Sequence, residues 1–412
     1  MRGARQLITL RGPAEPRRGA ALKELGIIRD GALVIEDGRI VEVGLSRRVE
    51  NLALAHRCQE IDATGHVVMP GFVDCHAHLV WGVAGLDEYE TRIAGAGGEP
   101  AEELRSTIQA LRNVAAKRLE SRARQFVNAM IRHGTTTVEA KSGYGLDERD
   151  ELKILRVQAM LNRAPLDIAS TFLAPRNLPA THAGDPAGYI SWMCSVLLPS
   201  IRRRGFARFA GLRCGEGSLN MDLSRRYLEA ARALGFLLKV HAGQSAASDA
   251  VRLAVEVGAA SVDNLRKVDT AEVDLLALSN TLAVLLPGCY FYDGGGWCAP
   301  ARQLIDGGAA VALGTNFNPG ASSTCSMPVV VALACAHLGM SPAEAICAAT
   351  FNAACAMGCE KVAGSLEVGK PADLIVLNAS DYREIPYYFG VNLVNRTVKR
   401  GVTVYQEGKV GR

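Results

Sequence analysis

The sequence has no regular cysteine spacing and no long apolar run. Its 11 cysteines are an odd number and lie scattered, without a Cys-x-x-Cys pair. This argues against a disulfide framework and favours a reducing, cytoplasmic location. No segment approaches the ~20 apolar residues of a membrane span. The basic first residues lead into prolines and charges instead of an apolar stretch, so we expect neither a secretory signal nor membrane association.

The chain also lacks a strong excess of one charge. It carries 46 Lys and Arg against 42 Asp and Glu, a formal net charge of +4. This balance argues against a nucleic-acid-binding surface, and we expect the basic cluster at 202–204 to lie on a solvated helix. A small molecule is the expected partner, and a homodimer is left open.

Two histidines one residue apart, His76 and His78, follow an apolar run at 67–73. The run predicts one buried strand, and residues i and i+2 of a strand point to the same face, so both imidazoles can reach one metal ion. A His-x-His pair alone is more often a chance neighbourhood than a metal site.

A third histidine, His241, ends another short apolar run that is followed by glycine. Three imidazoles at strand ends form a nitrogen site suited to zinc or ferrous iron, with space for water or substrate. We therefore predict one Zn or Fe ion per chain. The remaining histidines are expected to be surface or core residues: His56, His66, His133, His182 and His337.

Both ends of the chain are rich in short β-type segments. Runs at 33–36 and 39–43 flank Asp37-Gly38, a strong hairpin signal, and similar runs recur at 373–377 and 402–406. We predict that residues 1–66 and 362–412 form one small, discontinuous β-sandwich domain.

Between these ends, apolar runs alternate with helical patterns. With the strand before His76, eight runs are present, the number of a closed (β/α)8 barrel of the α/β class. The other seven expected strands lie at 135–141, 168–173, 211–214, 237–241, 260–265, 281–286 and 310–315. Helices are expected at 147–162, 222–234 and 246–257. Residues 67–361 should form the barrel, with an insertion at 78–134 over its mouth.

Several motifs, in order along nearly the whole chain, resemble imidazolonepropionases of the amidohydrolase superfamily. They include Lys-Ser-Gly-Tyr-Gly-Leu at 141–146, together with segments 70–78, 139–140, 285–288, 317–320 and 364–374. The resemblance implies a metal-dependent hydrolase that opens the C–N bond of 4-imidazolone-5-propanoate to give N-formimidoyl-glutamate, in histidine degradation.

The resemblance implies a ligand set for the metal, and this chain departs from it. His76, His78 and His241 match three ligands, whereas the family's fourth metal residue, an Asp, is Asn316. A carboxamide offers a neutral oxygen and cannot act as a base near pH 7. The family's histidine after strand six is Asn264, and the acid often found after the third histidine is Gln244. Three proton-accepting groups of the candidate catalytic site are thus replaced together.

The residues expected around the substrate are partly retained. Tyr144, Asn318 and Gly320 match the family and should contact the substrate. A family histidine after strand three is Arg176, a fixed cation that we predict binds an anionic group.

Three hypotheses therefore remain open. The first is a hydrolase acting on the family substrate. The second is a paralogue acting on another heterocycle, such as a sulfur-bearing or hydantoin-like analogue. The third is a non-catalytic relative that binds a small molecule, since a fold does not fix a function.

Overall fold

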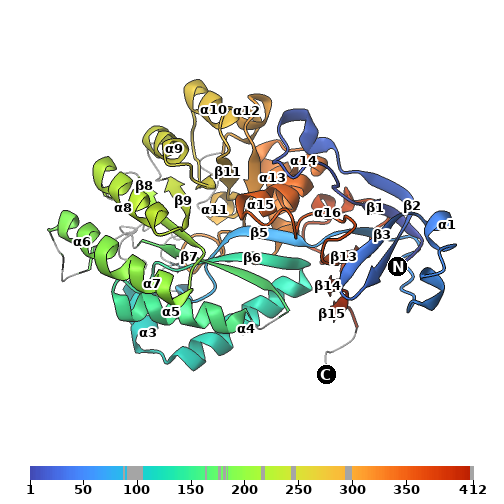
Figure 1. Ribbon diagram of the computed structural model, residues 1–412, viewed down its shortest axis with the longest axis horizontal. Helices are drawn as coiled ribbons and strands as arrows, with labels where there is room; N and C mark the ends of the chain where they lie inside the picture. The colour runs from blue at the N-terminus through green and yellow to red at the C-terminus, as the bar shows by residue number, and fades with distance from the viewer. Residues whose placement is uncertain are drawn as a thin grey trace.

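Two sheets organise the chain: an eight-stranded parallel sheet surrounded by helices and a seven-stranded sheet built from the two ends (Figure 1). A computed structural model describes residues 1–86, 89–90, 105–162, 165–174, 178–179, 182, 184–214, 219–242, 247–292 and 299–408. The predicted α/β barrel with a terminal β domain is confirmed.

Each of the eight barrel strands pairs in parallel with the next. They are β5 (Phe72–Ala77), β6 (Thr135–Lys141), β7 (Asp167–Leu173), β8 (Phe209–Cys214), β9 (Leu237–Ala242), β10 (Ser261–Asp263), β11 (Leu282–Leu285) and β12 (Val311–Leu313). The first strand meets the segment after the last, because Asn316 N–H donates to the His76 carbonyl at 2.8 Å and His78 N–H to the Phe317 carbonyl at 2.8 Å. This contact closes the barrel.

Helices follow the strands and cover the outside of the barrel (Figure 1). They are α3 (Arg105–Asn113), α4 (Ala116–Arg132), α5 (Glu148–Leu161), α6 (Pro186–Trp192), α7 (Leu198–Arg204), α8 (Met221–Ala233), α9 (Ala247–Glu256), α10 (Thr270–Ala277), α11 (Pro287–Tyr292), α12 (Ala301–Asp306), α13 (Met327–Leu338), α14 (Pro342–Ala348) and α15 (Phe351–Ala356). Outward-facing strand residues such as Ala210, Leu212 and Val240 pack with them in the main core. This alternation leaves every second strand residue facing the barrel interior.

The terminal sheet joins segments from opposite ends of the chain (Figure 1). Its order is β15 (Val402–Gln406), β14 (Val394–Lys399), β13 (Leu374–Leu377), β4 (Val67–Pro70), β1 (Ala4–Ile8), β2 (Ile27–Glu36) and β3 (Arg39–Leu45). The short helix α1 (Ser46–Val49) packs on β2 and β3, whereas α16 (Glu384–Tyr387), which follows β13 in the chain, packs on α13 of the barrel. Ile40 near one edge and Val398 near the other share one buried core, so the sheet curls around its own side chains. The hairpin at Asp37-Gly38 forms as predicted, with positive φ at both residues.

The predicted single strand before His76 is wrong, because it is two strands in different sheets. β4 pairs with β1 and β13, and β5 begins the barrel. Gly71 separates them where a Cβ atom would lie 2.2 Å from Thr136 Cγ2, so only glycine fits without a shift. At Gly71 the chain leaves the terminal sheet and enters the barrel.

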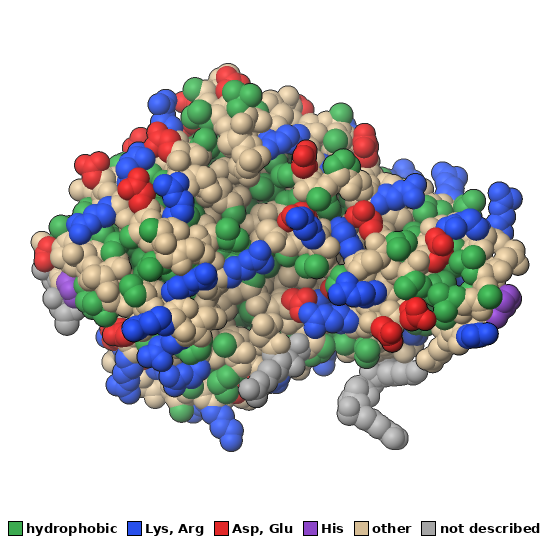
Figure 2. Space-filling view, viewed as in Figure 1, with side chains coloured by type: hydrophobic (Ala, Val, Ile, Leu, Met, Phe, Trp, Pro, Cys, Tyr) green, Lys and Arg blue, Asp and Glu red, His purple; other side chains and the backbone are tan. Residues whose placement is uncertain are grey.

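The cysteines in the described part of the chain are all free thiols. Among the described residues, no helix combines the length and apolarity needed to span a membrane. Basic and acidic side chains are interspersed over the face in Figure 2, as the near balance of charges predicts.

Candidate active site

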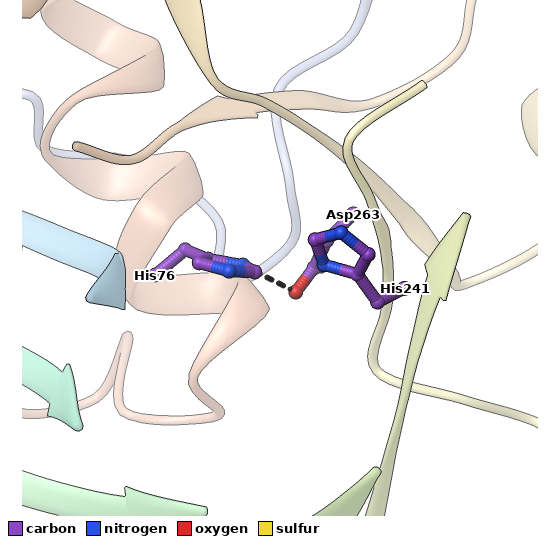
Figure 3. Close-up of side chains that lie close together, drawn as sticks. All are labelled: His76, His241 and Asp263. Atoms are coloured by element: carbon purple, nitrogen blue, oxygen red, sulfur yellow. Dashed lines mark hydrogen bonds and ion pairs between the residues drawn. The ribbon is translucent and has the colours of Figure 1, made fainter. Parts of the chain in front are cut away.

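Polar side chains line the barrel interior at the carboxyl ends of its strands. His76 on β5, His241 on β9 and Asp263 on β10 lie side by side, because His241 and Asp263 are direct partners in the parallel register. One potential ligand atom from each of the three lies within 4.8 Å of the others (Figure 3). All three are buried, so the cluster is held inside the protein.

Asp263 fixes the orientation of the His76 ring. Its Oδ2 lies 2.7 Å from His76 Nδ1, while the other ring nitrogen, Nε2, is buried without a hydrogen-bond partner. A histidine that ligates a metal usually donates its second N–H to a carboxylate in this way. The lone pair of His76 at Nε2 is therefore available to an ion.

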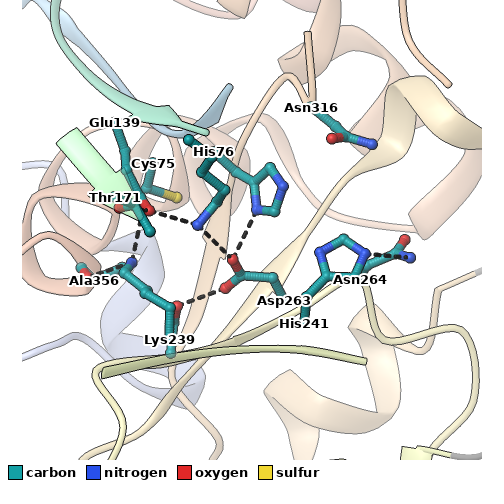
Figure 4. Close-up of polar contacts among 12 residues, drawn as sticks. Cys75, His76, Glu139, Thr171, Lys239, His241, Asp263, Asn264, Asn316 and Ala356 are labelled. Carbon is teal, nitrogen blue, oxygen red and sulfur yellow. Dashed lines mark hydrogen bonds and ion pairs between the residues drawn. The ribbon is translucent and has the colours of Figure 1, made fainter. Parts of the chain in front are cut away.

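A buried ionic layer lies next to this cluster (Figure 4). Lys141 Nζ is 2.5 Å from Glu139 Oε1 and 3.2 Å from Asp263 Oδ2, and Lys239 Nζ is 3.0 Å from Glu139 Oε2. Burial alone would raise the pKa of Asp263, but the charge of Lys141 and the contact with His76 hold it well below its ordinary value. The charges of two lysines and two carboxylates thus neutralise one another inside the barrel.

His241 carries two polar neighbours on one ring nitrogen. Arg213 Nη2 lies 3.1 Å from His241 Nε2, and Asn264 Nδ2 lies 3.3 Å from the same atom. Both neighbours donate hydrogens, so Nε2 is the unprotonated acceptor. Burial, followed by the charge of Arg213, lowers the pKa of His241 well below its usual value, so this imidazole is neutral at pH 7.

His78, which directly follows β5, contacts the ring of Tyr144. The His76 and His78 ring centroids are 6.0 Å apart, and those of His78 and Tyr144 are 5.0 Å apart. Burial lowers the pKa of His78 well below its ordinary value and raises that of Tyr144. At neutral pH the imidazole is therefore uncharged and the phenol keeps its proton.

A buried carboxylate organises the loop that carries Tyr144. Glu151 on α5 accepts backbone hydrogen bonds from Gly143 at 3.1 Å, Gly145 at 2.6 Å and Leu146 at 3.4 Å. Burial raises the pKa of Glu151 to about 7. The retained motif at 141–146 thus depends on a helix residue outside it.

Asn316 stands at the mouth of the barrel, with its amide directed to a thiol. Its Nδ2 lies 2.9 Å from Cys289 Sγ, and the residue adopts a left-handed backbone with φ of 47°. Asn264 is also left-handed, with φ of 65°. Asn is among the non-glycine residues that adopt this conformation most readily, so both residues suit the backbone at their positions.

Two other predicted substrate contacts form a turn beside Asn316. The side-chain oxygen of Asn318 accepts from Gly320 N–H at 2.8 Å, and its amide donates to the Asn316 carbonyl at 2.6 Å. This bonding gives Asn318 a structural role in the turn. The predicted residues Arg176 and Gln244 lie outside the described residues, and their roles stay predictions.

The donor set fits a metal ion. Asp263 orients the ring of His76, whose buried Nε2 has no hydrogen-bond partner. Burial lowers the pKa of His76, His78 and His241, which favours the neutral form that ligates metals. His241 lies nearest, with its ring centroid 5.3 Å from that of His76, and to ligate an ion through Nε2 it would exchange its hydrogen bonds from Arg213 and Asn264 for the metal.

Sequence reasoning missed Asp263 and Arg213. Both are register partners of His241, Asp263 as the last residue of β10 and Arg213 as the last but one of β8. The available signal was a charged residue at the last inward-facing position of an otherwise apolar strand.

The chain resembles known proteins over its whole length. The profile of the Amidohydrolase family matches residues 218–404. The imidazolonepropionase of Geobacillus kaustophilus is 40% identical over 100% of this chain and 98% of its own length. That of Symbiobacterium thermophilum is also 40% identical with the same coverage, and that of Porphyromonas gingivalis is 39% identical over 97% of this chain and 96% of its own.

Solved structures share the fold at low identity. Atrazine chlorohydrolase TrzN from Arthrobacter aurescens, complexed with zinc, superposes with a TM-score of 0.69 at 17% identity over 98% of this chain and 94% of its own. Guanine deaminase of E. coli gives a TM-score of 0.68 at 18% identity over 99% of each chain. Full-length identity near 40%, on a barrel with histidines at the expected strand ends, shows that the chain belongs to the imidazolonepropionase family of the amidohydrolase superfamily.

Proposed function

We propose that this protein is a metal-dependent hydrolase that opens the ring of 4-imidazolone-5-propanoate to give N-formimidoyl-glutamate in histidine degradation. The observation that carries the proposal is the convergence of His76, His241 and Asp263 at the barrel mouth, in a member of this family. A small heterocyclic substrate and a cytoplasmic location belong to the same proposal.

In this reaction the elements of water are added across a C–N bond. The hydroxyl joins the ring carbonyl carbon, that carbon separates from the ring nitrogen, and the nitrogen takes the remaining proton. We propose that His76, His78 and His241 hold one zinc or iron ion. When bound, such an ion polarises a carbonyl and lowers the pKa of water.

The chain's own residues have distinct roles under this proposal. Asp263 orients His76, and the buried phenol of Tyr144 is a neutral hydrogen-bond donor beside His78. Asn264 and Asn316 can hydrogen-bond a substrate but cannot take up a proton near pH 7. They therefore act as orienting groups and not as bases.

A second candidate is hydrolysis of another five-membered cyclic amide. The carboxamides at Asn264 and Asn316, with Arg213 beside His241, favour it, because the polar groups around the histidines have changed together. A non-catalytic binding role is less well supported, because the histidine cluster and its orienting carboxylate are intact.

Turnover of 4-imidazolone-5-propanoate by the metal-loaded protein, followed as loss of its ultraviolet absorbance, tests the first candidate. We expect a rate well above background. A background rate together with hydrolysis of a hydantoin or thio analogue would replace the first candidate with the second.

The metal assignment is tested by elemental analysis after mild purification, which should give about one ion per chain. Asp263→Asn should weaken metal affinity by ~10- to ~100-fold, because the orientation of His76 is lost. Asp167→Asn, at the far end of a barrel strand, is the matched control. If His241→Ala leaves both metal content and melting temperature unchanged, the assignment is wrong.

A further inference from the structure

The loop between β6 and α5 is built around one buried carboxylate, that of Glu151. Its Oε1 accepts hydrogen bonds from the N–H groups of Gly145 at 2.6 Å and Leu146 at 3.4 Å. Its Oε2 accepts one from Gly143 N–H at 3.1 Å, and the Ser142 hydroxyl donates to the same carboxylate. Four donors of the segment 142–146 therefore converge on a single side chain.

The backbone of this loop has the shape that such a convergence requires. Gly143 and Leu146 both lie in the left-handed region, with φ of 108° and 66°. A Cβ atom at Gly145 would lie 2.4 Å from Glu151 N, so the loop packs directly on the first turn of α5. Turns that aim several N–H groups at one point bind anions, and a helix N-terminus also favours negative charge. The conformation of the loop thus depends on the Glu151 carboxylate.

The same loop carries Tyr144 to the histidine cluster. The ring centroid of Tyr144 lies 5.0 Å from that of His78, and its side chain is buried. Tyr144 stands between Gly143 and Gly145, which have no side chains that could fix the loop by packing. The backbone hydrogen bonds of these two glycines to Glu151 therefore determine where the phenol points.

We infer that Glu151 is a positioning residue, which acts through the loop to hold the Tyr144 hydroxyl where it donates a hydrogen bond to the bound heterocycle. The inference rests on the proposed function for the location of the site. It requires a carboxylate and not only a side chain of this shape. In Glu151→Gln the amide N–H groups would face an N–H group of the loop, and two donors cannot pair.

Hydrogen exchange tests the hold on the loop without any ligand. At pH 8 the wild-type carboxylate is ionised, because its pKa is about 7. In Glu151→Gln we expect the amides of 142–146 to exchange ~10- to ~100-fold faster, the size of one lost hydrogen bond to a charged group, while those of β9 keep their rates. Equal exchange of this loop in the two proteins would overturn the inference.

Steady-state kinetics tests the effect on Tyr144, with 4-imidazolone-5-propanoate and the metal-loaded full-length protein. Glu151→Gln should raise KM ~10-fold and change kcat less than ~3-fold, because a displaced donor weakens binding. A role in folding alone would lower the amount of active enzyme, and thus kcat, and leave KM unchanged. In the Tyr144→Phe background, Glu151→Gln should have no further effect on KM. Additive losses in the double variant would contradict the inference.

Glu344→Gln is the matched control for lost stability. Glu344 is a buried carboxylate on α14 that accepts from Ser341 N–H at 2.7 Å. The control should leave both KM and the exchange of 142–146 unchanged.

Calorimetric titration with imidazole-4-propanoate separates the inference from turnover. If the wild type does not hydrolyse imidazolone propanoate, but Glu151→Gln and Tyr144→Phe weaken binding of this probe non-additively, the proposed function fails and the inference holds. Hydrolysis by the wild type with an unchanged KM in Glu151→Gln would have the opposite meaning. A wild type that binds neither compound would overturn both.

Discussion

Two neighbouring regions of the barrel differ in the charge of their buried side chains. In the buried layer, Glu139, Lys141, Lys239 and Asp263 form ion pairs between 2.5 and 3.2 Å and are almost completely inaccessible to solvent. At the mouth, the position at which the resemblance implies an Asp is Asn316, a neutral amide next to a thiol.

The difference indicates which amino-acid substitutions each region can accept without a large loss of stability. Removing one member of the buried layer leaves its partner charged and unpaired in a low-dielectric interior, which is costly. At the mouth, a carboxamide in a left-handed conformation satisfies the backbone and leaves no buried counter-charge. Chemistry can therefore change at the mouth while the layer beneath stays fixed.

The strongest test of this comparison is Glu139→Gln. Glu139 contacts both buried lysines and accepts from Thr171 Oγ1 at 2.6 Å. We expect the free energy of unfolding to fall by about 3–5 kcal/mol, measured by chemical denaturation, because Lys239 would lose its carboxylate partner.

The control for Glu139→Gln is an exposed pair. Arg225 and Glu256 are 2.6 Å apart, with side chains 42% and 52% exposed. Glu256→Gln should cost no more than about 1 kcal/mol. Similar losses for the two variants would remove the distinction between the buried layer and the rest of the molecule.

A second test uses the pH dependence of stability and the loop that carries Tyr144. Burial raises the pKa of Glu151 from 4.5 to about 7 in the folded protein. Protonated Glu151 therefore favours folding below pH 4.5, and this contribution is lost as the pH rises through 7. Between pH 5 and 8 the wild type should lose on the order of 2 kcal/mol relative to Glu151→Gln, from denaturation curves at each pH. Parallel curves for the two proteins would contradict this assignment.

The sequence predicted the fold closely, because hydrophobic period and turn residues are local signals. Strand β6 has the predicted bounds 135–141, and β15 those of 402–406. The split at Gly71 was missed, because an unbroken apolar run does not reveal which sheet each half joins. The packing of Thr136 against Gly71 is a contact between distant segments.

The candidate site was predicted only in part, for the same physical reason. His76 and His241 lie together with Asp263, and His78 lies with its ring centroid 6.0 Å from that of His76, while the role of the three histidines as metal ligands stays a prediction. Asp263 was overlooked because its partner His76 lies 187 residues away along the chain. Arg213 was overlooked because the sequence alone does not show which residues of β8 point into the barrel and which point out of it. Asn318 was predicted as a substrate contact, but its amide holds its own turn, which only the hydrogen bonds reveal.

The smallest expected effect comes from restoring the family's residues at the mouth with Asn316→Asp and Asn264→His together. A well-placed general base contributes ~100- to ~10,000-fold, provided that the substrate is held in position. Here a carboxylate at 316 would face Cys289, and an imidazole at 264 would meet Arg213 beside His241. We therefore expect the rate of imidazolone hydrolysis to rise by less than ~10-fold, with the metal content unchanged. Steady-state rates of the single and double variants measure this, with the melting temperature as a check on folding. A gain of ~100-fold or more would mean that the mouth differs from the family only in proton transfer and that the rest of the pocket still holds the family substrate.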